Sequence, residues 1–135
     1  MNWPGICVAL ATASAPTFSV RAQEGDAARG AELFPIRCIE CHAVRVSDRQ
    51  EDGPNLSGLI GRTSGSQEGY EFSDTMKGAG IGWSQETIIT HLVAPRKVVP
   101  GTRMNFNGLK RPGEAEDIVA YLPQIGQWRQ PKGPA

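Results

Sequence analysis

The feature that most constrains this chain is a short motif at positions 38–42, where the residues read Cys-Ile-Glu-Cys-His. Two cysteines at this spacing are found in redox-active disulfides and in halves of zinc sites. A redox protein of the thioredoxin type carries a strand before the motif and strand–helix repeats after it, and the sequence shows neither. A structural zinc site needs about four ligands. Beyond the motif only His91 remains as a histidine, and nothing pairs with it at ligand spacing.

The histidine that directly follows the second cysteine indicates covalent haem attachment instead. In such sites two thiols form thioethers with the haem vinyl groups, and the adjacent imidazole binds the iron from one face. We therefore expect one haem c, attached through Cys38 and Cys41, with His42 as an iron ligand. The composition agrees, because aromatic residues make up only 7% of the chain, while 16 glycines and 10 prolines favour loops. Such a thin core needs a bulky apolar group to complete it.

The N-terminal residues 1–22 differ from the rest of the chain. Residues 6–15 form an uncharged, mostly apolar run, too short for a bilayer span of ~20 residues. The sequence Val20-Arg21-Ala22 then offers a small-residue cleavage site, as in a secretory signal peptide. Ala11-Thr12-Ala13 is a competing site, no Lys or Arg precedes the run, and a disordered extension is the alternative. We expect a signal peptide at 1–22, and hence a mature protein that is soluble and periplasmic.

The rest of the chain is expected to form one domain, at residues 23–126, and a mobile C-terminal tail, at residues 127–135. Three segments of the domain have helical patterns. The first begins at an N-cap, Asp26, and runs into the haem motif, with Pro35 as a candidate kink near its end. The second begins after Ser84 and is expected to stop at Pro95. The third follows Pro112-Gly113, carries Ile118, Tyr121, Leu122 and Ile125 at helical spacing, and is expected to end or distort near Pro123.

Four motifs appear in a fixed order along the chain. They are Gly25-Asp26 leading to Gly30 and Phe34; Cys38-x-x-Cys41-His42; Gly53-Pro54-Asn55-Leu56 with Gly58-Leu59 and Gly61-Arg62; and Pro100-Gly101-Thr102-Arg103-Met104. Because it carries these four motifs in this order, the sequence resembles the class I c-type cytochromes, which include mitochondrial cytochrome c and soluble bacterial relatives. The resemblance implies an all-α fold. Three main helices, short helices and long loops would wrap around one covalently bound haem.

The resemblance also implies roles for individual residues. Met104 would be the second axial ligand of the iron, opposite His42, and the Pro54 carbonyl would accept the other ring hydrogen of His42. Gly30 would let the first helix cross closely against Tyr121 of the last. The haem propionates need partners, because burying an unpaired charge is costly. Their expected partners are Arg62, Ser73, Trp83 and Thr102; without the resemblance, Arg62 is an ordinary surface arginine and Trp83 an ordinary core aromatic.

Three residues depart from the pattern of these cytochromes. His91 and Phe72 each stand where a tyrosine is common, and Met76 stands where an asparagine is common. These changes leave the attachment motif intact but affect the potential and the hydrogen bonding around the iron. His91 is either a neutral core histidine or a group that tunes, or competes for, the second axial position.

The charge balance excludes a strongly basic nucleic-acid-binding protein, since 14 Lys and Arg residues match 14 Asp and Glu residues. The charges are nevertheless uneven. The segment Arg96–Arg111 holds five basic residues and no acidic one, whereas residues 23–95 hold eleven acidic and six basic residues. A local positive surface can steer an acidic partner. We expect this segment to dock on a membrane cytochrome bc complex, a terminal oxidase, a photosynthetic reaction centre or another acidic redox protein.

The predicted function is that of a monomeric, soluble one-electron carrier between respiratory or photosynthetic complexes. It is not predicted to be an enzyme, because His42 and Met104 would occupy both axial positions. One alternative is a haem enzyme or small-gas sensor in which Met104 dissociates and His91 assists at the iron. The other is a fixed electron-transfer subunit of a larger dehydrogenase.

Overall fold

The computed structural model describes residues 24–49 and 52–124. The predicted signal peptide and the predicted C-terminal tail lie outside the described residues. In the described part there are three longer helices, three short ones and a single isolated bridge, Thr63 to Gly82, with no β-strand. The expected all-α fold is confirmed. The elements are α1 (Ala27–Arg37), α2 (Asp74–Gly78), α3 (Gln85–Val93), α4 (Pro95–Val98), α5 (Glu114–Tyr121) and a 3-10 helix (Leu122–Gln124).

Helix α1 begins at the predicted N-cap. The Asp26 side chain accepts hydrogen bonds from the backbone N–H groups of Ala28 and Arg29. Pro35 lies inside α1 and does not end it, because the helix continues to Arg37. Directly after the helix the N–H of Cys38 donates to the carbonyl of Phe34 at 2.9 Å. The haem motif therefore follows the helix end without a flexible linker.

Helix α3 also begins and ends where its sequence predicts. The Ser84 side chain accepts from the N–H of Thr87, and the Thr87 hydroxyl accepts from the N–H of Ser84, which makes a reciprocal cap. The helix ends at Val93, just before Pro95. Pro95 then occupies the first turn of α4, a position where its missing N–H costs no intrahelical bond. The proline thus ends one helix and starts another.

Helix α5 is shorter than its apolar pattern suggests. It ends at Tyr121, and the chain tightens into a 3-10 turn around Pro123. The 3-10 turn matches the distortion expected near Pro123. Ile125, the last residue of the apolar pattern, lies outside the described residues.

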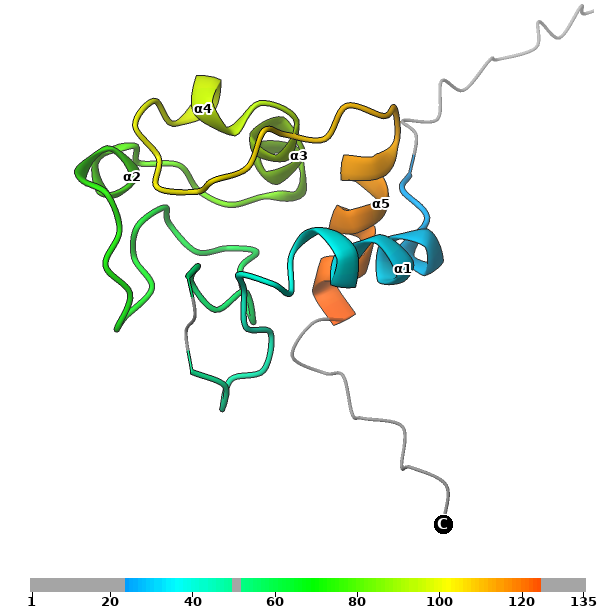
Figure 1. The fold of residues 1–135 in the computed structure, drawn as a ribbon, viewed down its shortest axis with the longest axis horizontal. Coiled ribbons are helices and arrows are strands. Elements are labelled where there is room, and N and C mark those ends of the chain that lie inside the picture. Colours follow the sequence, from blue (N-terminus) through cyan, green and yellow to red (C-terminus); the bar gives the residue numbers. More distant parts are fainter. Residues whose placement is uncertain (1–23, 50–51, 125–135) are drawn as a thin grey trace, which may run out of the picture.

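Helices α1 and α5 cross in close contact (Figure 1). A Cβ atom at Gly30 would overlap the carbonyl oxygen of Asp117 and approach the Tyr121 side chain, so only glycine permits this approach. The rings of Phe34 and Tyr121 meet edge to face with centroids 5.6 Å apart. The buried Asp117 carboxylate accepts from the Asp26 N–H at 2.7 Å and lies 3.0 Å from the Arg29 guanidinium. Apolar contact and charge together fix the crossing.

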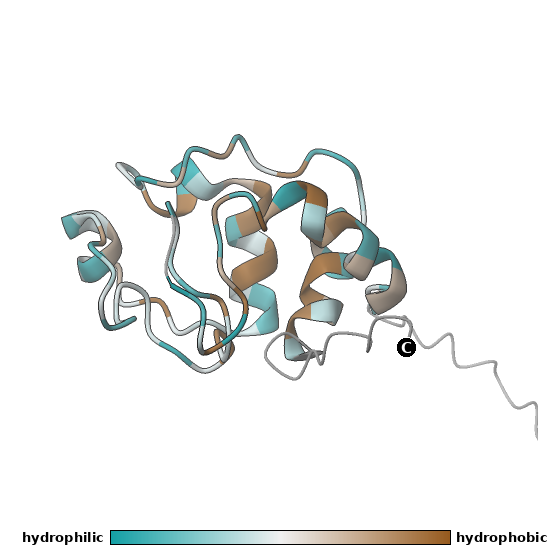
Figure 2. Cartoon of the chain, turned by 60° about the horizontal axis from the view of Figure 1, so that its bottom comes forward, coloured by the Kyte–Doolittle hydropathy of each residue, from teal (hydrophilic) through white to brown (hydrophobic). Residues whose placement is uncertain are grey.

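The described chain forms two walls that α5 joins at one end (Figure 1). Helices α3 and α4 and the segment 99–109 make the upper wall, and the loops of residues 38–49 and 52–60 make the lower one. Hydrophobic positions concentrate on the helices and occur singly along the loops (Figure 2). The buried core consists of Phe34, Trp83, Ile88, Leu109, Ala115, Ile118, Val119 and Leu122.

Candidate haem site

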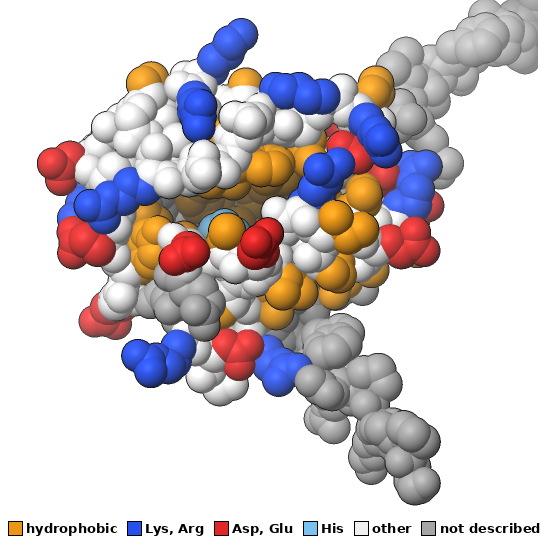
Figure 3. All heavy atoms as spheres, in the orientation of Figure 1, with side chains coloured by type: hydrophobic (Ala, Val, Ile, Leu, Met, Phe, Trp, Pro, Cys, Tyr) orange, Lys and Arg blue, Asp and Glu red, His pale blue; other side chains and the backbone are white. Residues whose placement is uncertain are grey.

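A cavity of about 680 Å³ lies between the two walls and opens on the face seen in Figure 3, where an imidazole is visible in the hollow. Its volume is within the roughly 300–1,000 Å³ range of small-molecule and cofactor sites. Its lining is mainly apolar and includes core side chains such as Phe34 and Ile118. All nine residues to which the sequence assigns a role at the haem line this one cavity: Cys38, Cys41, His42, Pro54, Arg62, Ser73, Trp83, Thr102 and Met104.

The two cysteines of the motif lie in a tight turn after α1. The N–H groups of Cys41 and His42 both donate to the carbonyl of Cys38, at 3.2 and 2.9 Å. Both thiols are free, which does not support a disulfide here. Burial raises the pKa of the Cys38 thiol to about 12, although the neighbouring Arg37 charge opposes this shift. Redox-active and metal-binding cysteines work as thiolates, so this environment favours a neutral sulfur such as a thioether.

The loop after the motif orients the imidazole of His42. Its Nδ1 lies 2.8 Å from the carbonyl oxygen of Pro54, to which the ring N–H donates, so the Nε2 lone pair remains free to bind a metal. Burial lowers the pKa of His42, and the bond to Pro54 opposes this shift only in part. The ring is therefore neutral at pH 7, as an iron ligand must be.

Two methionine sulfurs and a second imidazole line the same cavity. Met104 comes from the segment 99–109 and is half-buried, and its N–H donates to the Thr102 hydroxyl at 3.2 Å. Met76 of α2 and His91 of α3 also line the cavity. The structure thus brings Met104 to the predicted side, and its coordination to iron stays a prediction.

Arg62 is a partly buried cation whose hydrogen bonding is incomplete. One guanidinium nitrogen donates to the Asn55 carbonyl at 2.9 Å, while Nε and Nη1 are buried without a hydrogen-bond partner. Burial lowers the pKa of Arg62, yet an arginine stays charged at pH 7. Buried donors of this kind call for an anionic partner. The carboxylates of a haem would supply it, so the donor set fits the cofactor.

The hydroxyl oxygens of Ser73 and Thr102 each accept a hydrogen bond from a backbone N–H group. Ser73 caps α2 by accepting from the N–H of Met76 at 3.2 Å, and Thr102 accepts from the N–H of Met104. A hydroxyl that accepts one bond still has a proton to donate. Both residues therefore remain free to bond a propionate, and that role stays a prediction.

The sequence reasoning missed Tyr70. Its hydroxyl donates to the backbone carbonyl of Asp52 at 2.7 Å, and its ring meets Phe72 edge to face at 4.7 Å. All three residues line the cavity. Tyr70 lies in a loop without periodicity, and its partner is 18 residues away, so no local pattern marks it.

Among the described residues, no group of three or more His, Cys, Asp or Glu side chains is arranged to hold a metal ion. None of the helices described is both long and apolar enough to cross a membrane.

Comparison with known proteins identifies the family. The family model described as "Cytochrome c" matches residues 27–126. Cytochrome c of Cochliobolus lunatus is 42% identical over 102 residues, 76% of this chain and 94% of that protein. Cytochrome c of Stellaria longipes is 43% identical over 100 residues, 74% of this chain and 93% of that protein. Cytochrome c of Gibberella zeae is 45% identical over 98 residues, 73% of this chain and 92% of that protein. The chain therefore belongs to the cytochrome c family of electron carriers, in which haem c is attached covalently through cysteines.

Proposed function

We propose that this protein carries single electrons with a haem iron ligated by His42 and Met104. The observation that carries the proposal is the bond from His42 Nδ1 to the Pro54 carbonyl, at 2.8 Å. It leaves Nε2 as the ligating atom on the lower wall, while Met104 approaches from the upper wall. A bound haem would exchange one electron at its iron, and a thioether ligand favours the ferrous state and raises the potential.

This ligand pair leaves no axial position for a substrate. A haem held by these residues would supply the electron exchange, and a redox partner would reach it through the cavity mouth, which Figure 3 views directly. The absence of a vacant ligand position supports a carrier over an enzyme. A soluble monomer that moves between respiratory or photosynthetic complexes is the proposed form.

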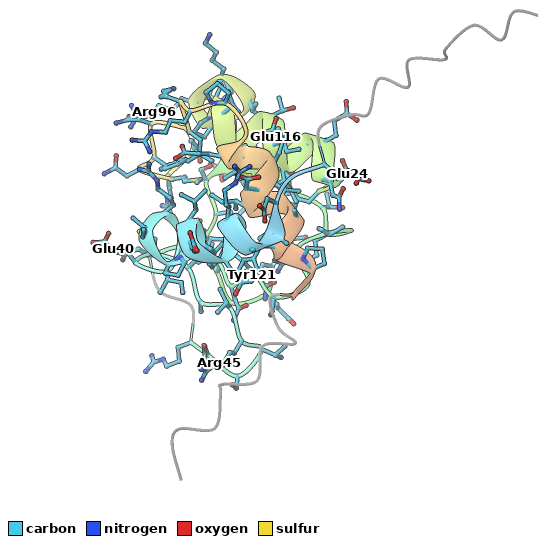
Figure 4. All side chains as sticks on the ribbon, turned by 90° about the vertical axis from the view of Figure 1, so that its right-hand side faces the viewer. Glu24, Glu40, Arg45, Arg96, Glu116 and Tyr121 are labelled. Carbon is cyan, nitrogen blue, oxygen red and sulfur yellow. The ribbon has the colours of Figure 1, made fainter. Side chains whose placement is uncertain are left out.

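Charges around the mouth support docking on an acidic partner. Arg103 lines the cavity, and Arg96 projects on the face that carries the mouth (Figure 4). Both belong to the basic segment Arg96–Arg111, and Glu40 projects from the lower part of the same face. We propose that the basic part of this face steers the protein to acidic redox partners: a membrane cytochrome bc complex, a terminal oxidase or a photosynthetic reaction centre.

The last part of the proposal is that the protein is exported to the periplasm. The uncharged run and small-residue site in residues 1–22 support removal of a signal peptide and a periplasmic location. N-terminal sequencing of the protein purified from a periplasmic extract tests this step. A first residue of Gln23, after cleavage at Ala22, is the expected result. Intact protein with Met1 in the cytoplasm would contradict it.

The test of the carrier is a redox titration of the holoprotein with visible and near-infrared spectra. The ferric protein should show the weak sulfur–iron charge-transfer band, and Met104→Ala should remove the band and lower the potential. Met76→Leu is the matched control, because it removes the sulfur of the other methionine that lines the cavity and should keep the band. If the parent lacks the band and Met104→Ala leaves the spectrum unchanged, the ligand assignment is wrong. Met76 or His91 would then be the candidates.

A further inference from the structure

His91 is a buried imidazole whose Nδ1 has no hydrogen-bond partner among the described residues. Its side chain comes from α3 and is only 7% exposed, and its Nδ1 is enclosed with no partner. Its ring packs against the ring of Trp83, tilted by 59° with centroids 5.1 Å apart. Unpartnered buried polar groups are rare in folded proteins, and each one calls for an explanation. Because Nδ1 is enclosed, the ring nitrogen that can meet a group in the cavity lined by His91 is Nε2.

His91 belongs to the same wall of the cavity as Met104. The N–H of Leu109 donates to the carbonyl of Leu92 at 2.8 Å, which ties the segment 99–109 to α3 one residue after His91. A Cβ atom at Gly108 would overlap the carbonyl oxygen of Val93, so the contact is tight. The lower wall carries His42 (Figure 1). A haem bound through His42 therefore has His91 and Met104 together on its other side.

Among the described residues, none of the polar groups that share the cavity forms a hydrogen bond with the Nδ1 of His91. Burial lowers the pKa of His91, so the ring is neutral at pH 7 and keeps one nitrogen lone pair. A neutral imidazole is a good iron ligand, and a thioether is a weaker one for ferric iron.

We propose that His91 is a reserve axial ligand, which binds the haem iron when Met104 leaves it. The sulfur–iron bond breaks and a nitrogen–iron bond forms, with no electron transferred and no proton released. The consequence is functional: loss of Met104 does not open the iron to external ligands, so the carrier resists conversion into an open-site haem protein. The inference rests on the proposed ligation by Met104.

The experiment compares cyanide binding and spin state in ferric Met104→Ala and in Met104→Ala/His91→Phe, both as holoproteins. Met104→Ala should be low-spin, with the electron paramagnetic resonance spectrum of two nitrogen ligands. The double variant should be high-spin and should bind cyanide at least about tenfold more readily, as expected when His91 leaves only about one tenth of the iron open. A high-spin Met104→Ala protein that binds cyanide as readily as the double variant would overturn the proposal.

Three controls keep the result specific. His91→Phe alone should keep the sulfur–iron band, which shows that the fold and Met104 ligation survive. Met104→Ala/Met76→Leu should stay low-spin, and if it opens the iron instead, Met76 is the reserve ligand and the proposal is wrong. Should the phenylalanine double variant take up no haem, Met104→Ala/His91→Gln gives the same comparison. A parent without the sulfur band contradicts the proposed function, whereas a parent with the band and an open Met104→Ala contradicts only this inference.

Discussion

The imidazole of His42 is held by a 2.8 Å hydrogen bond from its Nδ1 to the carbonyl oxygen of Pro54. The preceding residue, Gly53, makes this bond possible, because a Cβ atom there would lie only 2.6 Å from Nδ1. The Gly53 N–H also donates to the Cys41 carbonyl at 2.7 Å, which pins the loop to the haem motif. Attachment and ligand orientation therefore depend on one glycine.

Gly53→Ala should displace the His42 ring and weaken the proximal ligand. The added methyl group forces either the ring or the loop to move, so we expect a loss of about 1–3 kcal/mol in unfolding free energy, as for overpacked sites. Denaturant unfolding of the holoprotein measures this loss. Gly78→Ala is the matched control, because a Cβ atom there meets nothing within 4 Å. Equal stability of the two variants would show that the loop can absorb the clash.

Docking on an acidic partner predicts a charge-specific effect on electron transfer. Lys97→Glu/Arg103→Glu should slow reaction with ferricyanide, an anionic probe, by about tenfold at low ionic strength, because steering acts on encounter. The difference should shrink as salt shortens the Debye length below about 8 Å. The potential should change little, since both side chains are exposed.

Two comparisons make the docking test specific. Arg45→Glu, which lies at the opposite end of the molecule from Arg96 in Figure 4, should leave the rate nearly unchanged. Hexaammineruthenium, a cationic probe, should react faster with the double variant than with the parent. Equal rates of parent and double variant with both probes at low salt would place the docking face elsewhere.

The parts of the fold that sequence predicts are those set by neighbouring residues. The N-caps Asp26 and Ser84 bond groups two or three positions ahead, so their side-chain types alone mark the helix starts. The attachment motif is equally local. The positions of the short helices α2 and α4 are not predicted, because five and four residues carry too little periodicity to be detected.

The parts that sequence cannot predict depend on contacts between distant segments. No local pattern near Tyr70 predicts its bond to Asp52. Arginines are usually exposed, so the burial of two guanidinium nitrogens of Arg62 follows only from the assembled cavity. The partnerless ring of His91 is a similar case. Its placement beside Trp83 comes from the packing of α3, which no short pattern specifies.

Arg62 should raise the potential of the bound haem. A buried positive charge disfavours the ferric state, and its removal also leaves any paired carboxylate uncompensated, which stabilises the ferric state further. Arg62→Met should therefore lower the midpoint potential by about 60 mV, a tenfold change for one electron. Arg111→Met is the control, because its side chain is 81% exposed and water screens its charge. An unchanged or raised potential in Arg62→Met would show that Arg62 does not pair with the haem propionates.

The last prediction is that the chain does not fold cooperatively without its haem. The cavity of about 680 Å³ is lined by core residues such as Phe34 and Ile118, so without a haem these apolar walls face water instead of a packed interior. An ordinary domain is stabilised by only about 5–15 kcal/mol, so the loss of this burial removes a large part of the stability. Cys38→Ala/Cys41→Ala should lose stable haem retention and most of its far-ultraviolet helical signal. Glu40→Gln, inside the same motif, should retain both. A cooperative thermal transition in the haem-free polypeptide would show that the two walls close into a core of their own.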